Sequence, residues 1–174
     1  PGELKLENNE IKEITPSGLL LKEFSLKIGR PLEKGRIYSI SAGDGIRDFA
    51  GNRAGISTFS FGLPEIAGRG DIIFNELLFN PLPGEPDYAE FYNNSDRIVD
   101  VARLMIASVD SDTGDTSSSC YLSEQHRCLL PGEYYAVTTD RKAVIERFPS
   151  SDAGRIFEIP DLPPMHDDNG HLIL

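Results

Sequence analysis

The sequence predicts an all-β protein built as antiparallel β-sandwiches, and two observations carry this prediction. Apolar side chains recur at every second residue in several short segments, as they do in strands with one buried face. Clusters of Gly, Pro, Asn and Asp, such as NPLPGEPD and LPGE, separate these segments at the spacing expected of a sandwich. The strand segments are residues 21–28, 36–41, 57–61, 71–79 and 134–139.

The first three strand segments belong to a module that we expect to span residues 1–66, followed by a second module at 67–174. The stretch GLPEIAGRG, residues 62–70, is rich in glycine and has little apolar pattern, as linkers do, so we place the boundary near Ala67. The first module has room for only four or five strands. That number can barely close a sandwich and would leave strand edges and apolar faces uncovered, so we expect this module to be partial.

One segment of the second module departs from the strand pattern. TTDRKAVIERFP provides Thr139 or Asp140 as a helix N-cap and Pro149 as a stop signal. Val144 and the phenylalanine four residues after it share one helical face. We therefore predict a single short helix near residues 140–148.

The chain carries 17 basic and 28 acidic residues, for a net charge of −11 at pH 7. Such a charge repels phosphate backbones and anionic lipid surfaces, so we expect no nucleic acid partner. The chain contains no run of about 18 apolar residues, the length that a membrane-spanning helix needs, so we expect no direct insertion into a membrane. The N-terminus, PGELKLENNE, lacks both an initiator Met and the pattern of a signal peptide, so we expect a piece of a longer protein whose export signal lies outside it.

Two acids stand in the apolar segments of the second module and raise the question of a catalytic pair. Glu76 lies in DIIFNELLFNP and Glu90 in DYAEFYNNS. Strict alternation places Glu76 on the inner face with Phe74, and Glu90 on the outer face with Tyr88. A retaining glycosidase needs its two carboxyl groups about 5.5 Å apart across a cleft, which opposite faces do not provide. We therefore expect no enzyme, and a structural Glu76 that accepts hydrogen bonds from the backbone or from Asn93.

The stretch DSDTGDTSSS offers the best metal candidate, because Asp110, Asp112 and Asp115 supply the hard oxygen ligands that calcium prefers. The loop lacks the glycine and the bidentate glutamate of an EF-hand, which would fall at Asp115 and Tyr121. The alternative is a solvated hairpin loop whose Asp and Ser side chains satisfy nearby backbone groups. We expect no other cofactor.

Cys120 and Cys128 are the only cysteines. They can form a disulfide across a hairpin in an oxidising compartment, or remain two free thiols in a reducing one. Both alternatives stay open on the sequence alone.

Four tyrosines, Tyr88, Tyr92, Tyr134 and Tyr135, cluster on or near the same predicted hairpins. Aromatic faces stack well on sugars and on partner proteins, so these side chains are candidates for a binding surface. We nonetheless expect half of them to pack in the core or at its rim.

The order of motifs in residues 71–174 resembles the lamin tail domain in its bacterial form. The family pattern is a strand ending in I-N-E, a strand E-x-Y-N, a V-D-L segment, a P-G-x-Y hairpin and a late N-x-G before an apolar strand. The resemblance implies an immunoglobulin-like β-sandwich whose motif residues are structural rather than catalytic. The family usually continues past a strand like HLIL, so the resemblance implies a missing last strand and an open edge that pairs with another chain. The matching residues are Phe74, Asn75, Glu76, Glu90, Tyr92, Asn93, Val99, Asp100, Val101, Pro131, Gly132, Tyr134, Asn169 and Gly170.

The first module carries a second resemblance. GDGIRDFAGNRAG, with Tyr38 before it and Asp48, Gly51 and Asn52 within it, resembles the C-terminal part of a bacterial immunoglobulin-like domain of the secreted and surface-layer type. The resemblance implies a location that is secreted, periplasmic or at the surface of a bacterium.

Together these observations predict a non-catalytic extracellular module for binding, anchoring or spacing in a larger secreted or surface protein of a bacterium. Its partner would be a protein or a glycan at the cell surface. The alternative is a calcium-binding module or an accessory domain of a secreted hydrolase.

Overall fold

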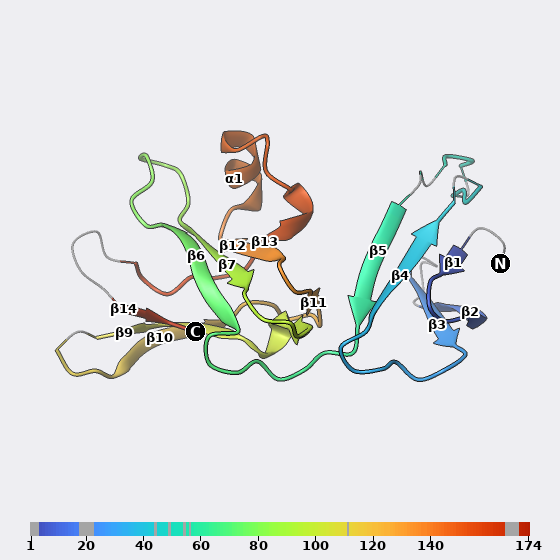
Figure 1. The fold of residues 1–174 in the computed structure, drawn as a ribbon. Coiled ribbons are helices and arrows are strands. Elements are labelled where there is room, and N and C mark those ends of the chain that lie inside the picture. The colour runs from blue at the N-terminus through green and yellow to red at the C-terminus, as the bar shows by residue number, and fades with distance from the viewer. Residues whose placement is uncertain are drawn as a thin grey trace. The chain divides into compact units, whose positions relative to one another are not determined.

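The computed structural model describes residues 4–17, 23–43, 45–48, 50–53, 55, 57–110, 112–165 and 171–174 (Figure 1). Strands account for 46% of the described residues and helices for 8%, which confirms the all-β prediction. The chain divides into two compact units, Pro1–Leu63 and Pro64–Leu174, so the division falls within the predicted linker. We call them the N-terminal and the C-terminal unit and describe each by itself.

The N-terminal unit contains a three-stranded sheet and a separate hairpin. The sheet has the order β1-β4-β5, with β1 at Leu4–Leu6, β4 at Ile37–Ala42 and β5 at Ser57–Gly62. The hairpin pairs β2, Ile11–Ser17, with β3, Glu23–Ile28. The five strands of the described residues match the four or five for which the sequence has room, and a partial module stays a prediction.

Tyr38 is the one buried apolar side chain among the described residues of the N-terminal unit, and its hydroxyl accepts a hydrogen bond from the Glu33 amide at 3.0 Å. Phe24 and Phe59 remain mostly exposed. The turn before β5 is held by Asp48, whose Oδ1 accepts from the Asn52 amide at 2.9 Å and whose Oδ2 accepts from the Asn52 side chain at 2.8 Å. Asp48 and Asn52 of the motif GDGIRDFAGN therefore serve turn geometry.

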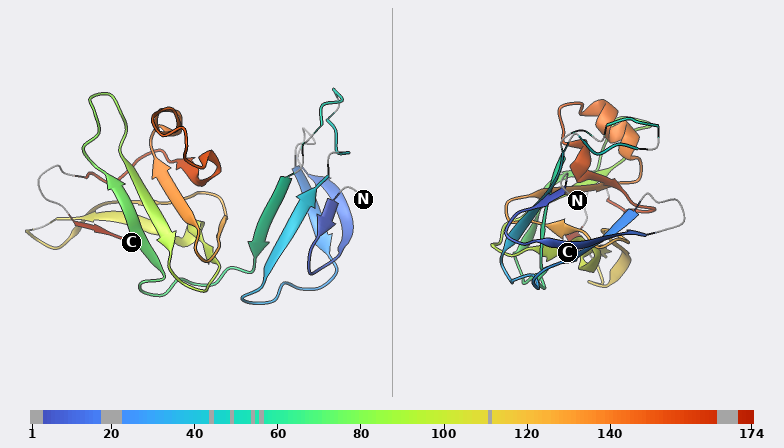
Figure 2. Two further views of the ribbon diagram at one scale, coloured as in Figure 1. Left: turned by 45° about the horizontal axis from the view of Figure 1, so that its top comes forward. Right: turned by 90° about the vertical axis from the view of Figure 1, so that its right-hand side faces the viewer.

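The C-terminal unit is a two-layer sandwich (Figure 2). One layer is the four-stranded sheet β13-β12-β7-β6. The other is the three-stranded sheet β10-β9-β14, next to a short pair of β11 with β8. The bounds are β6 Ile72–Leu78, β7 Tyr88–Asn93, β8 Val99–Asp100, β9 Met105–Val109, β10 Thr116–Tyr121, β11 Cys128–Leu129, β12 Tyr134–Thr138, β13 Ile156–Glu158 and β14 His171–Ile173.

The core of this sandwich forms where the two layers face each other. Phe91 of β7 and Val137 of β12 pack in one cluster with Ile106 of β9 and Leu122, and all four are almost completely buried. Burying apolar side chains contributes roughly 1.5–3 kcal/mol for each, so this cluster is the main source of stability. Alternation along β7 and β12 puts every second side chain into it, as the sequence predicted.

A second, smaller cluster lies on the other face of the four-stranded sheet, which we call the outer face. Helix α1, Arg141–Arg147, starts at Asp140, whose side chain accepts from the Ala143 amide at 2.9 Å. This confirms the helix predicted near residues 140–148. Val144 of α1 packs on Tyr88 and Ala136, so the helix covers part of the outer face. Two 3-10 turns, η1 at Val101–Arg103 and η2 at Ala153–Arg155, complete the helical content of the described residues.

The expected inward position of Glu76 is wrong, because β6 contains a β-bulge. Phe74 pairs with Phe91 and Glu76 pairs with Glu90, so Asn75 is one extra residue on its strand. The extra residue shifts the alternation: Phe74 and Leu77 pack on the core, whereas Glu76 is exposed. A strict period of two cannot anticipate such an insertion.

Strand β14 forms one edge of its sheet and pairs with β9 through His171 and Val109. Asn169 and Gly170, which belong to the resemblance, lie outside the described residues. Pairing of an open edge with another chain stays a prediction.

Deleting Asn75 should leave the C-terminal unit folded, because a regular ladder then keeps Phe74 and Leu77 inward and Glu76 outward. We expect the free energy of unfolding to fall by only about 1 kcal/mol, the value of the lost side-chain hydrogen bond. Leu77→Ala should instead cost about 2 kcal/mol or more, because it removes an apolar side chain that packs on the core. Urea unfolding followed by near-UV circular dichroism would measure both, since five of the six tyrosines lie in this unit. Equal losses for the two variants would contradict this account of the bulge.

Candidate binding site on the outer face

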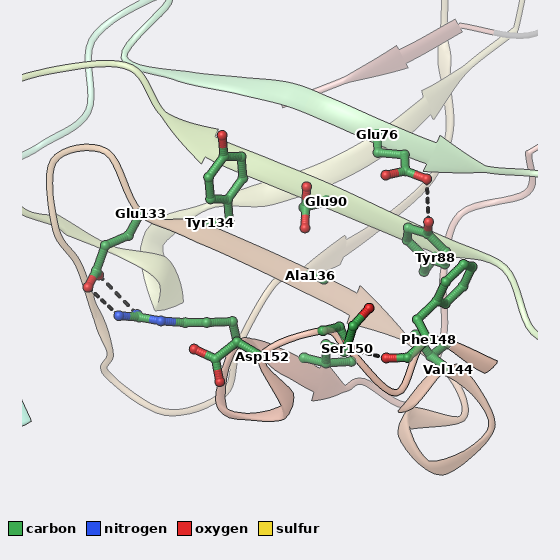
Figure 3. A pocket seen from close by; sticks show the side chains of 13 residues that line it. Glu76, Tyr88, Glu90, Glu133, Tyr134, Ala136, Val144, Phe148, Ser150 and Asp152 are labelled. Carbon is green, nitrogen blue, oxygen red and sulfur yellow. Dashed lines mark hydrogen bonds and ion pairs between the residues drawn. The ribbon is translucent and has the colours of Figure 1, made fainter. Parts of the chain in front are cut away.

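A pocket of about 480 Å³ lies on the outer face, between strands β6, β7 and β12 and the segment of residues 148–156 (Figure 3). Helix α1 covers one end of the face, and the pocket occupies the space left beside it. The sheet forms the floor, and the chain after α1 forms the wall. The lining residues are Glu76, Tyr88, Glu90, Glu133, Tyr134, Ala136, Val144, Phe148, Ser150, Ser151, Asp152, Arg155 and Ile156.

Glu76 and Glu90 are direct cross-strand partners, and both line this pocket. The expectation that the two acids face different environments is therefore wrong, and the bulge at Asn75 is the reason. Tyr88 donates its hydroxyl proton to Glu76 Oε1 at 2.5 Å, and Asn75 Nδ2 donates to Glu90 Oε1 at 2.7 Å. Burial, and then the hydrogen bond to Glu76, raise the pKa of Tyr88 above its ordinary value. Asn93, the donor expected for Glu76, bonds elsewhere.

The two carboxyl groups have polar, solvent-accessible surroundings. A glycosidase holds one carboxyl group protonated by surrounding it with apolar side chains. Glu76 is exposed to solvent, and Glu90 is only half-buried beside the polar Asn75. Each side chain accepts a hydrogen bond from a neutral donor and keeps further oxygen lone pairs for hydrogen bonds from a ligand.

The remaining charged groups of the pocket are partly neutralised. Arg155 forms a bidentate ion pair with Glu133, with one contact at 2.9 Å between Nη1 and Oε2 and a second from Nη2 to Oε1. Asp152 caps η2 by accepting from the Gly154 amide at 2.9 Å. Arg155 is the one cationic side chain in the described lining, so Glu76, Glu90 and Asp152 have no cationic partner there. The pocket therefore carries net negative charge.

The four candidate tyrosines divide between the two faces of the sheet. Tyr134 is 44% exposed, and its ring lies 4.9 Å from that of Tyr92 on the outer face. Tyr88 is buried under α1. Tyr135 points into the core, where it stacks on Phe157 with ring centres 4.4 Å apart and donates to the Leu122 carbonyl at 3.2 Å. Only Tyr92 and Tyr134 thus offer ring surface to a ligand.

The other motif residues build the scaffold. Asn93 is completely buried: its Nδ2 donates to the carbonyls of Arg97 and Leu129, and its Oδ1 accepts from the amide and hydroxyl of Ser95. Gly132, which follows Pro131, adopts φ +77°, and its amide donates to the Asn93 carbonyl at 2.9 Å. These contacts tie the turn before β12 to the end of β7.

Asp100 is a buried acid that supports the turn after β8. Its Oδ1 accepts from the amides of Ala102 and Arg127, and its Oδ2 lies 2.6 Å from Nδ1 of the largely exposed His126. Burial acts to raise the pKa of Asp100, but the hydrogen bonds from His126 and from the two amides outweigh burial and lower the pKa. Sequence reasoning did not foresee the partnership with His126, which lies 26 residues away.

The calcium candidates do not converge in the structure. Asp110 Oδ1 accepts from the amides of Asp112 and Thr113, both at 2.9 Å, and these bonds lower the pKa of Asp110. Among the residues that the structure describes, no three His, Cys, Asp or Glu side chains form a group that could hold a metal ion. The set of Asp110, Asp112 and Asp115 therefore belongs to a turn, and the expectation of calcium ligands is not met.

The structure holds Cys120 and Cys128 as two thiols that are not joined by a disulfide. Burial and the charge of Asp161 raise the pKa of the Cys120 thiol, which disfavours the reactive thiolate. Cys120 also lines a larger hollow of about 780 Å³ near β13. The guanidinium groups there are already engaged: Arg127 lies 4.5 Å from the centre of the Phe157 ring, and Arg141 Nε donates to the Ile156 carbonyl at 2.7 Å.

Several lining residues of the outer-face pocket were missed at the level of sequence. Glu133, Asp152, Arg155 and the serines of the wall come from the segments that flank β12 and α1. Tertiary packing alone brings them beside β6 and β7, and no spacing in the chain signals their approach. The pocket is an outcome of the bulge and of the path taken after α1.

Asp100→Asn should reduce stability in a pH-dependent way. The lowered pKa of Asp100 in the folded state means that its charge stabilises the fold above pH about 4. This contribution is lost as the pH falls through the folded-state pKa. We expect the free energy of unfolding of the variant to be about 1–2 kcal/mol lower than that of the wild type at pH 7. This gap between the two free energies should narrow below pH about 4. Urea titrations at a series of pH values would measure the gap, and a gap that stays constant down to pH about 3 would contradict the assignment.

Asp110→Ala should lower the melting temperature of the C-terminal unit, because two amide hydrogen bonds are lost. EDTA and added calcium should leave the melting temperatures of the wild type and of the variant unchanged. Differential scanning calorimetry would test both statements. A stabilisation of the wild type by calcium that Asp110→Ala abolishes would restore the calcium site.

The comparison of this chain with known proteins adds no assignment to the geometry of the pocket. Within the residues that the structure describes, no helix is long and apolar enough to cross a membrane. Compared with protein-family models, with curated proteins and with solved structures, the chain matches none of them.

Proposed function

We propose that this protein is a non-catalytic binding module of a larger secreted or surface-attached bacterial protein, and that the outer-face pocket is its binding site. One observation carries the proposal: a concave site of about 480 Å³ combines an apolar surface, where α1 meets the sheet, with polar groups that already have fixed orientations. Sites of this composition are the usual place for ligands in proteins. Tyr88 and Asn75 hold the two glutamates in place before any ligand arrives.

The chemistry of the lining supports binding rather than turnover. The described lining contains no histidine, cysteine or lysine that could activate a nucleophile. Ser151 is one of its two serines. Its hydroxyl donates to the Phe148 carbonyl at 2.6 Å, so this hydrogen bond holds the wall of the pocket. The carboxylates of Glu76 and Glu90 remain as hydrogen-bond acceptors.

The extracellular setting belongs to the same proposal and is supported by the two sequence resemblances, to the lamin tail domain and to bacterial immunoglobulin-like domains. The partner is a protein or a glycan at the cell surface, because the net charge of −11 disfavours nucleic acid. The role of accessory domain in a secreted hydrolase is compatible with such binding. Within the part of the chain that the structure describes, no group of side chains favours the calcium alternative.

Ser150→Trp tests the proposal, because this exposed residue lies on the pocket wall and a large ring there fills the pocket without disturbing the core. Ser119→Trp places the same ring on an exposed position of β10 and serves as the control. We expect wild-type protein to bind a subset of spots on glycan and peptide arrays, Ser150→Trp to lose them, and Ser119→Trp to keep them. Binding that survives in Ser150→Trp, or no binding at all by the wild type, would overturn the proposal.

A further inference from the structure

We propose that the outer-face pocket takes an arginine side chain, presented by an extended basic segment of a partner protein. This inference rests on the proposed binding function and names the chemistry of its ligand. It depends on three features of the pocket: its uncompensated charge, its apolar surface where α1 meets the sheet, and the exposed ring at its rim.

The charge of the pocket selects a cation. Glu76, Glu90 and Asp152 have no cationic partner in the described lining, whereas Arg155 is already neutralised by Glu133. A neutral ligand, such as an uncharged sugar, would take these carboxylates out of water without compensating their charge, which is costly. A cationic group supplies the compensation and forms charge-assisted hydrogen bonds.

An inorganic cation does not suit the same residues. Calcium takes six to eight oxygen ligands at roughly 2.3–2.6 Å, so its carboxylates must converge on one point. No such group of three acidic side chains exists among the described residues, and the acids of the pocket are spread over strand, turn and loop. A larger organic cation, whose donors point in several directions, can reach carboxylates that a metal ion cannot.

The apolar part of the lining fits the stem of a long basic side chain. Ala136, Val144, Phe148 and Ile156 form a continuous apolar surface where α1 meets the sheet. Arginine and lysine bury their methylene groups along such surfaces and keep their charged ends in a polar environment. The stem would lie against these four residues, with the charged end directed to the glutamates of β6 and β7 (Figure 3).

The placement of the two glutamates favours arginine over lysine. Cross-strand partners have Cβ atoms about 4.5–5.5 Å apart, so a planar group with five N–H donors can bridge Glu76 and Glu90. Lysine is a compact charge with three donors and cannot span the pair in the same way. Tyr134 adds a ring on which a guanidinium group stacks favourably.

The test uses the whole protein and three acetylated, amidated peptides of the sequence GRGRGRG, in which the basic positions hold arginine, lysine or citrulline. Citrulline has the shape of arginine without its charge. Binding is followed by NMR titration, with the amide shifts of the lining residues as the readout. The double variant Glu76→Gln with Glu90→Gln removes two charges from the pocket, and Glu124→Gln removes one from an exposed position outside it.

We expect the arginine peptide to shift the signals of the lining residues, and the lysine peptide to bind several-fold more weakly. The citrulline peptide should not bind. The double variant should weaken binding of the arginine peptide at least about tenfold, whereas Glu124→Gln should leave binding unchanged. The remote variant matters because a net charge of −11 attracts any cation without specificity.

Equal affinity for the arginine and lysine peptides, or unchanged affinity in the double variant, would overturn the inference. If the arginine peptide fails to bind while array ligands still depend on Ser150, the ligand class is wrong and the proposed function stands. If nothing binds in a way that Ser150→Trp prevents, the proposed function fails as well.

Discussion

The extra residue in β6 is the constraint on which the outer face depends. In the first part of β6, Ile72 and Phe74 point into the core, two residues apart. After the extra residue Asn75, the next side chain that points into the core is Leu77, so the alternation continues with the opposite phase. This single shift lets Leu77 join the core and turns Glu76 outward beside Glu90. Without it, one face of the sheet would hold a buried carboxylate and the other would hold only one acid. The charge of the pocket is therefore a consequence of strand geometry.

The structure keeps its stabilising contacts and its ligand-facing groups largely apart. The contacts that hold the sandwich together lie in the interior and at the ends of β7 and β8, where Asn93 and Asp100 satisfy buried backbone groups. The groups free to meet a ligand lie on the outer face, on strands already fixed by that interior. Such a division lets the polar groups of the pocket stay oriented without contributing to the core.

Much of the fold could be predicted from sequence, and the reasons are physical. Period two marked β12 because Tyr135 and Val137 point into the core at alternate positions, and Asp140 with Pro149 marked the helix. The pattern failed at Asn75, since a bulge leaves no signal in apolar spacing. The pocket was beyond reach for a different reason: Glu133, Asp152 and Arg155 approach it through tertiary packing. The sequence correctly placed Asp110 in a loop. It did not show that Asp110 Oδ1 accepts hydrogen bonds from the amides of Asp112 and Thr113.

The wall and the floor of the pocket differ in what holds them, and this difference bears on how relatives of the protein can diverge. The floor consists of strands whose other side is the core, so its residues change only at a cost in stability. Ser150, Ser151 and Asp152 of the wall are exposed, and Arg155 anchors their segment to Glu133 at one end. Substitutions among these wall positions alter the lining and leave the sandwich intact. Substitutions in the wall segment can therefore change the ligand preference during evolution while the sandwich is retained.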